Sequence, residues 1–201
     1  GSSRYWPRFC ARSTPPDELF VLLPLATAGA LAMVCARHFA SLYLGLEILS
    51  ISIYTMAAYF RDSRIGTEAA VKYLVLAGTA AAFLLFGMAL VYAELGTLSL
   101  PELANATPAQ GANGVLVLGF AMILVGVGFK LSIVPFHLWT ADVYQGAPTS
   151  VTAFMSSGAK IAGFAALLRV FALAFPTLTA DLTPILATLA ALTMIGGNLI
   201  A

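Results

Sequence analysis

The order of apolar and polar residues divides the chain into long apolar segments separated by short polar stretches. Each segment has close to the ~20 residues that an α-helix needs to cross the hydrocarbon layer of a membrane. Backbone groups in lipid need partners within their own segment, and the two-residue alternation of a membrane β-strand is absent. The pattern predicts an all-α, polytopic bundle of about six spanning helices. The predicted segments are residues 18–37, 40–60, 68–93, 114–139, 150–175 and 182–201.

The polar stretches indicate which side of the membrane each turn occupies. Three arginines lie among residues 1–17 and two among residues 61–66, and two crossings separate these stretches. Residues 100–113 contain neither lysine nor arginine. Because basic residues favour the cytoplasmic side, we expect residues 1–17 and 61–66 to be cytoplasmic.

The same pattern predicts the domain organisation. Residues 1–17 are polar and basic, without the apolar core of a targeting signal, and are read as a cytoplasmic loop or a non-native remnant. The first residue is not Met, and the chain ends inside an apolar run. We therefore expect a piece of a larger membrane protein, with one helical unit over residues 18–175 and the start of another over 182–201.

Composition supports the membrane class and offers no cofactor site. Hydrophobic residues make up 60% of the chain and charged residues 9%, far from the balance of a soluble domain. The two cysteines and two histidines are isolated, which suggests neither a disulfide framework nor a metal site. The run GVGFKL lacks the third glycine of a dinucleotide motif and follows no strand. We predict no cofactor in this chain and no nucleic-acid partner, although the net charge of +1 by itself says little about partners.

Four ionisable residues lie within the apolar segments: Glu47, Lys72, Lys130 and Lys160. On insertion scales, each costs roughly 2.5 to 3.5 kcal/mol at the centre of a membrane helix unless a partner or water relieves it. Together they represent a penalty on the order of 10 kcal/mol. A polar path through the membrane would explain their presence.

Two of the predicted helices carry polar residues along one face. The stripe on residues 40–60 comprises Tyr43, Glu47, Ser50 and Tyr54, spaced at i, i+4, i+7 and i+11. The stripe on residues 150–175 comprises Thr152, Ser156 and Lys160, with Gly163 following on the same side. Gly163 would allow a neighbouring helix to approach closely. These two hydrophilic faces can meet inside the bundle.

The segment 114–139 contains a predicted break. Lys130 lies shortly before Pro135, whose ring removes one helical donor and crowds the carbonyl of Leu131. A break at membrane depth is tolerated only where protein or a water-filled cavity covers the freed backbone groups. In transporters such broken helices mark the ion path. We therefore expect Lys130 to lie beside a hydrated gap.

Structural alternatives exist for each candidate. Lys72, with Glu68 four residues before it, either extends to the headgroups or takes part in charge transfer. The deeper charges at positions 47, 130 and 160 either move protons or hold helices together as a buried pair. His137 either relays protons or binds a carbonyl freed at the break. The residues alone leave both His137 alternatives open.

Four runs carry a resemblance to a known family: LGLEILSISIY, EAAVKYLVLAGTAAAFLLFGMALVY, GFKLSIVPFHLWTADVYQGAPTSVTAF and SGAKIAGFA. They resemble the antiporter-like membrane subunits of respiratory complex I, the NADH:quinone oxidoreductase. These subunits share the PFH element and the buried lysines, whereas DVYQGAP looks particular to one of them. The resemblance extends from about Asp17 to the end of the chain. One departure is Ser150, where the family often has proline.

The resemblance implies two inverted five-helix repeats, each with one broken helix. Residues 18–175 would form the first repeat and 182–201 would begin the second. In such subunits the residue at Glu47 pairs with the one at Lys130, and Lys160 passes a proton toward the other half. Lys72 matches a further lysine of the family. With His137, these residues form the predicted proton-transfer set.

The implied function is proton translocation by a non-redox subunit, with no catalysis by this chain alone. NADH, FMN, iron–sulfur clusters and quinone would belong to partner subunits, and the other partners would be membrane subunits, the lipid bilayer and protons. A multi-pass protein of a bacterial inner (plasma) membrane is expected. The alternatives are a related cation/proton antiporter or membrane-bound hydrogenase subunit, a solute transporter of another fold, or a purely structural bundle.

Overall fold

The computed structural model describes residues 17–59, 63–106, 113–174 and 179–200, and every regular element in these ranges is a helix. The one strand-like pairing in the described ranges is an isolated bridge between His38 and Ser99. The all-α prediction is confirmed. In chain order the helices are α2 (Asp17–Cys35), α3 (Phe39–Ala57), α4 (Arg64–Leu95), α5 (Leu100–Ala106), α6 (Gly114–Leu131), α7 (Trp139–Gly146), α8 (Thr149–Ser156), α9 (Gly158–Leu168), the π-helix η2 (Arg169–Ala174) and α10 (Thr179–Ile200).

Five of these stretches are long and apolar enough to cross a membrane. They correspond to the first five predicted segments. The sixth predicted segment is also helical, as α10, but its apolar part, Thr183–Leu199, is shorter than the other five. The five long stretches are Glu18–Cys35, Phe39–Ala57, Arg64–Leu95, Gly114–Leu131 and Thr149–Phe171.

The structure differs from the predicted segments in three places. Helix α6 ends at Leu131, whereas the apolar pattern continues to residue 139. The polar stretch after α4 contains the short helix α5, whose Leu100 and Leu103 are buried. The segment 150–175 is interrupted between α8 and α9 at Ser157, whose ψ of −78° departs from helical geometry. An apolar run indicates that a segment is buried in lipid or protein. It does not indicate at which residue the helical hydrogen bonding ends.

Side-chain caps set the starts of three helices. The Ser63 hydroxyl accepts a hydrogen bond from the backbone N–H of Gly66 at the start of α4. Asn113 caps α6 by accepting from the backbone N–H of Leu116 at 2.8 Å. His38 uses Nδ1 in the same way at the start of α3. Each cap satisfies a backbone donor that the first turn of a helix leaves free.

Small residues bring the helix backbones close together. A Cβ atom added to Gly45 on α3 would lie 2.6 Å from the backbone nitrogen of Met33 on α2. A Cβ atom added to Gly87 on α4 would lie 2.6 Å from the carbonyl oxygen of Gly119 on α6. Close approach of this kind is typical of membrane helix packing, which depends on van der Waals contact. The pairs α2–α3 and α4–α6 are therefore in intimate contact.

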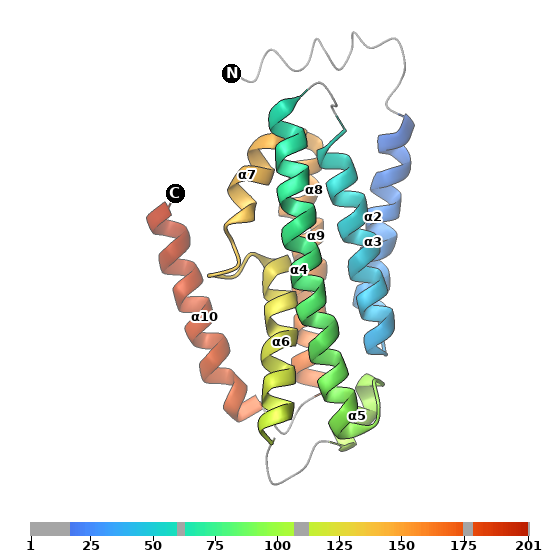
Figure 1. The fold of residues 1–201 in the computed structure, drawn as a ribbon, viewed down its shortest axis with the longest axis vertical. Helices are drawn as coiled ribbons and strands as arrows, with labels where there is room; N and C mark the ends of the chain where they lie inside the picture. The colour runs from blue at the N-terminus through green and yellow to red at the C-terminus, as the bar shows by residue number, and fades with distance from the viewer. Residues whose placement is uncertain (1–16, 60–62, 107–112, 175–178, 201) are drawn as a thin grey trace.

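Figure 1 shows how these contacts arrange the bundle. Helix α4 runs the length of the bundle, whereas α6 stops part-way along it and α7 continues toward the end at which α4 begins. Helix α5 lies at the opposite end, and α10 is set at an angle beside α6. The gap between α6 and α7 thus falls in the middle of the bundle, where the candidate site lies.

Candidate functional site

The broken helix is the centre of the site. Helix α6 ends in a left-handed residue, Ser132, with φ of 59° and ψ of 39°. The backbone N–H of Ser132 donates to the carbonyl of Phe129, and that of Ile133 donates to Gly128. These bonds close the last turn of α6 in the manner of a helix C-cap. The predicted break near Pro135 is confirmed, although the helix already ends at Leu131.

Side chains from three other elements satisfy the backbone groups that the break releases. The indole Nε1 of Trp139 donates to the carbonyl of Phe129 at 3.1 Å. Lys160 on α9 donates to the carbonyl of Lys130 at 3.3 Å. The backbone N–H of Val134 donates to the hydroxyl of Thr193 on α10 at 3.1 Å. Unpaired backbone groups are costly at membrane depth, so these contacts explain how the break persists there.

Lys130 is buried in the last turn of α6, with 4% of its surface exposed. Its Nζ donates to the hydroxyl of Ser50 on α3 at 2.9 Å and to the phenol of Tyr73 on α4 at 3.0 Å. Ser50 and Tyr73 are themselves buried. The ammonium is therefore held by two neutral oxygens contributed by two different helices.

Glu47 lies on α3, one turn before Ser50, and is half-buried. The implied pairing with Lys130 is not a direct ion pair here, because no described Lys, Arg or His nitrogen lies within 4.0 Å of the Glu47 carboxylate. The two charges still interact electrostatically through space. On the predicted stripe it is Ser50 that reaches Lys130. The carboxylate is near the amine but does not hold it.

Lys160 is half-buried on α9 and contacts the break directly. Its Nζ donates to the Ser132 hydroxyl and lies 5.0 Å from the centre of the Trp139 ring. The hydroxyl of Thr140, at the start of α7, also donates to Ser132, at 2.7 Å. Gly163 makes the predicted close approach, since a Cβ there would lie 3.0 Å from Leu131.

The second predicted stripe is only partly realised. Thr152 donates to the carbonyl of Tyr144, and the exposed Ser156 donates to Ala153 in its own helix. Neither residue has a described hydrogen bond to the break. Both residues lie on α8, which the interruption at Ser157 separates from α9 and Lys160.

Four aromatic rings form a cluster, Tyr73, Phe129, Trp139 and Tyr144, and the Lys130 and Lys160 amines lie over two of them, Tyr73 and Trp139. Trp139 is central, with ring centroids 4.8 Å from Tyr73 and 5.3 Å from Phe129. Tyr144 packs edge-on against Trp139 at 6.3 Å. Sequence reasoning identified neither Tyr73 nor Trp139 as a site residue. The sequence feature that could have identified them is their position: Tyr73 follows Lys72 on an apolar helix, and Trp139 follows the predicted break.

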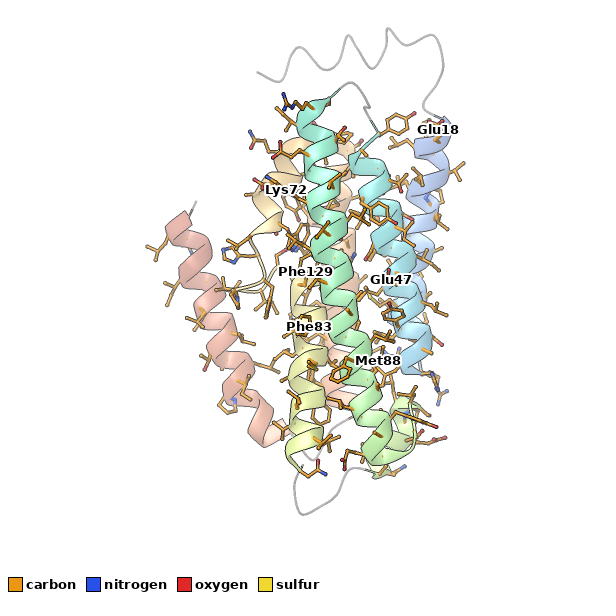
Figure 2. The ribbon with its side chains drawn as sticks, viewed as in Figure 1. Glu18, Glu47, Lys72, Phe83, Met88 and Phe129 are labelled. Carbon is orange, nitrogen blue, oxygen red and sulfur yellow. The ribbon has the colours of Figure 1, made fainter. Side chains whose placement is uncertain are left out.

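Lys72 lies apart from the deep amines. Figure 2 shows it nearer the end at which α4 begins, whereas Glu47 and Phe129 lie near the middle. Its Nζ lies 2.9 Å from the Glu68 carboxylate, as the spacing predicts, and 2.8 Å from the carboxylate of Asp142 on α7. Its side chain is 46% exposed. The contact with Asp142, which sequence reasoning missed, joins α7 to α4.

His137 lies in the turn between α6 and α7, and both of its ring nitrogens are buried without a hydrogen-bond partner in the described ranges. The interpretation that it binds a freed carbonyl does not hold in this structure, because neither ring nitrogen donates to a carbonyl of the described residues. A relay role stays a prediction. Within the described ranges, no three His, Cys, Asp or Glu side chains come together as a possible metal site.

Comparison with known proteins relates this geometry to a family. The transmembrane family described as NADH:quinone oxidoreductase/Mrp antiporter matches residues 36–201. The chain belongs to this family. The predicted resemblance is confirmed, and with its apolar helices the chain is a multi-pass membrane protein.

Relatives and solved structures agree with this assignment. NADH-quinone oxidoreductase subunit N of Nitrosomonas europaea is 45% identical over 92% of this chain and 38% of its own length. A chain of respiratory complex I from Thermus thermophilus with bound aureothin matches with a TM-score of 0.77 and 40% identity, over 91% of this chain and 39% of that one. A chain of the archaeal membrane-bound sulfane sulfur reductase matches with a TM-score of 0.78 and 31% identity, over 90% and 37%. The chain thus spans about two fifths of the length of these relatives.

Proposed function

We propose that this chain is part of a proton-translocating membrane subunit of an NADH:quinone oxidoreductase. The observation that carries the proposal is the arrangement of two amines at one broken helix. Lys130 projects its own amine to Ser50 and Tyr73, while its backbone carbonyl accepts a hydrogen bond from Lys160. Family membership and the similarity to a respiratory complex I chain support the assignment.

The arrangement suits reversible protonation of Lys130. Serine and tyrosine hydroxyls accept a hydrogen bond from an ammonium and can donate one to a neutral amine, so they can serve both charge states. Ser50, whose hydroxyl donates to the carbonyl of Leu46 in this structure, would have to give up that bond to do so. A carboxylate in contact would favour the ammonium strongly. With Glu47 near but not in contact, a small displacement of α3 relative to α6 changes its attraction for the lysine. This displacement would couple a conformational change to uptake or release of a proton.

The energy scale is appropriate for a pump. Moving one elementary charge through about 100 mV costs about 2.3 kcal/mol, and a change of one pKa unit corresponds to about 1.36 kcal/mol. A change of a few units at Lys130 would be enough to drive one proton against such a potential. Lys160 would receive the proton, and Lys72 and His137 would be auxiliary members of the path.

The redox chemistry would take place elsewhere in the complex. We propose that partner subunits bind NADH, FMN, iron–sulfur clusters and quinone, and that this chain transmits their conformational energy. The second helical unit, starting with α10, would carry the rest of the path. Residues 1–17 and 61–66 would face the cytoplasm, because they hold basic residues. The membrane would be that of a bacterium, since the similar subunit N belongs to Nitrosomonas europaea.

The test uses the full-length subunit in its assembled complex, reconstituted into vesicles. Lys130→Gln removes the charge while keeping a polar side chain of similar length, and Lys160→Arg keeps a charge that does not readily dissociate. We expect both variants to lose most NADH-driven proton pumping while the complex still assembles. Wild-type pumping and turnover in both would overturn the proposal.

A double variant separates proton transfer from a structural role. If Glu47 and Lys130 only hold helices together, joint replacement by Gln and Met should preserve activity, because buried charges can often be exchanged for apolar groups without loss of stability. If they carry protons, the double variant assembles but does not pump. Thermal stability and pumping, measured on the same preparation, distinguish the two outcomes.

A second candidate function is supported by the similarity to the sulfane sulfur reductase chain. In that case the same path would serve a related ion-translocating complex with a different electron acceptor. The proteins that co-purify with the full-length subunit decide between them. Flavin and iron–sulfur subunits with NADH-dependent quinone reduction would support the first candidate, and their absence alongside a sulfur reductase would support the second.

A further inference from the structure

Ser132 has an unusual backbone for a serine. It is the one non-glycine residue with positive φ in the described ranges, at 59°, and it occupies the position after α6 where glycine is the usual residue. A Cβ atom makes this left-handed conformation unfavourable, and glycine avoids that strain. A serine at such a position suggests that its side chain has a function, because strained residues persist where the surrounding structure requires them.

The side chain of Ser132 makes its hydrogen bonds to other elements. The end of its own helix, α6, is capped by backbone hydrogen bonds instead. Its hydroxyl accepts hydrogen bonds from Lys160 on α9 and from Thr140 at the start of α7. A single oxygen thus connects the end of α6, the start of α7 and the middle of the fifth span. The hydroxyl is not needed for the cap, since the backbone N–H groups of Ser132 and Ile133 already close the last turn.

We propose that Ser132 is a positioning residue that holds the Lys160 amine at the helix break in both of its charge states. This inference rests on the proposed function. An ammonium group only donates hydrogen bonds, whereas a neutral amine also accepts them. The second partner of Lys160, the carbonyl of Lys130, can only accept. Ser132 can accept from the ammonium and donate to the neutral amine, so it keeps Lys160 in place before and after proton loss.

Thr140 completes the arrangement. When Ser132 accepts from Lys160, its second acceptor site takes the hydrogen bond from Thr140 at 2.7 Å. When Ser132 rotates its proton toward a neutral Lys160, the bond from Thr140 remains possible, because the oxygen still has a free lone pair. Thr140 therefore fixes the orientation of the Ser132 side chain in both states. Its removal should have the same kind of effect as removal of the Ser132 hydroxyl, but a smaller one.

The deciding variant is Ser132→Gly in the full-length subunit within its assembled complex. Glycine is the preferred residue for the backbone at this position, so assembly and thermal stability should be retained or improved. Loss of the hydroxyl should lower NADH-driven proton pumping about tenfold, the effect expected for one hydrogen bond to a charged group. The pH dependence of pumping should also move, because the two charge states of Lys160 lose a common partner.

Matched variants supply the controls. Thr140→Val should lower pumping about threefold, as expected for a neutral hydrogen bond, and Thr140→Ser should restore it because the hydroxyl returns. Ser52→Ala removes another buried hydroxyl, one that bonds only to the carbonyl of Ile48 in its own helix, and should pump normally. If Ser132→Gly fails to assemble, the comparison of Thr140→Val with Thr140→Ser still decides the question.

Two outcomes overturn this inference without touching the proposed function. One is a Ser132→Gly complex that pumps as the wild type does at every pH while Lys160→Gln does not. The other is a further loss of pumping when Ser132→Gly is combined with Lys160→Gln, since a residue that acts through Lys160 has no effect once Lys160 is gone. Normal pumping in Lys160→Gln itself would instead contradict the proposed role of Lys160, and this inference with it.

Discussion

The two halves of the fourth span are held in the bundle by different kinds of contact. The first half, α6, packs against α4 through glycines whose backbones almost touch, as at Gly87 and Gly119. The second half begins with an open turn in which Trp139, Lys160 and Thr193 replace the missing backbone partners. The first half depends on the absence of side chains and the second on their presence. The protein therefore combines a close backbone contact and a set of polar side-chain contacts in the fourth span.

The largest effect should come from the glycine contact. Gly87→Val adds atoms where a Cβ alone would already lie 2.6 Å from the backbone of α6, so α4 and α6 must separate. We expect the complex containing this variant not to assemble, as measured by the yield of intact complex from membranes. Gly78→Val on the same helix is the control, because a Cβ added there meets no atom of another helix within 4 Å. Normal yield from Gly87→Val would show that α4 and α6 can separate at this point without loss of assembly.

The next largest effect concerns the buried amine. Lys130→Met removes a charge held by Ser50 and Tyr73, and it should abolish pumping while the complex still assembles. Lys72→Met removes a side chain that is nearly half exposed, and it should lower pumping by less. Pumping per NADH oxidised in reconstituted vesicles gives the comparison. Equal losses in the two variants would show that depth in the membrane does not distinguish the lysines.

A smaller effect is expected at the tryptophan. Trp139→Phe keeps an aromatic ring but removes one of the two donors to the carbonyl of Phe129, which still accepts from the backbone N–H of Ser132. We expect a loss of about 0.5–1.5 kcal/mol in stability, the net contribution of one hydrogen bond, and a partial loss of pumping. Thermal unfolding of the purified complex measures the first. Tyr92→Phe, at an exposed position on α4, should change neither quantity.

The smallest effect is expected at α7, the helix that follows the open turn. Asp142→Asn weakens the contact between α7 and Lys72, which is largely screened because both side chains are about half exposed. We expect a slight decrease in thermal stability at low salt that disappears at high salt. A large decrease that persists at high salt would show that α7 is held in place chiefly by this ion pair.

The fold was predictable from sequence because a membrane helix is encoded in continuous apolar length. The first five segments became the five long apolar stretches, and Pro135 indicated a break close to the true helix end. The true end, at Leu131, was not predictable, because Ser132 adopts a conformation that serine seldom takes. Helix α5 was missed for a related reason, since seven residues are too short for a clear periodic signal.

Prediction of the site was less complete. Lys130 and Lys160 were identified from the cost of burying a charge, and both lie at the break. The hydrogen-bond partners of Lys130 could not be identified, because Ser50 and Tyr73 come from two other helices. Glu47 shows the same difficulty. Its helical face was predicted, but the distance from that face to Lys130 depends on the packing of α3 against α6.

The sequence was enough to determine that this is an all-helical membrane protein with ionisable residues at membrane depth, because length, apolarity and charge are properties of single segments. Tertiary structure decided which groups those residues touch. A hydrogen bond between helices depends on their rotation and separation, which arise from contacts such as the glycine pairs and from the interruption at Ser157. The linkage of Lys160, Ser132 and Thr140 is of this kind, since it joins three segments whose spacing along the chain gives no sign that they meet.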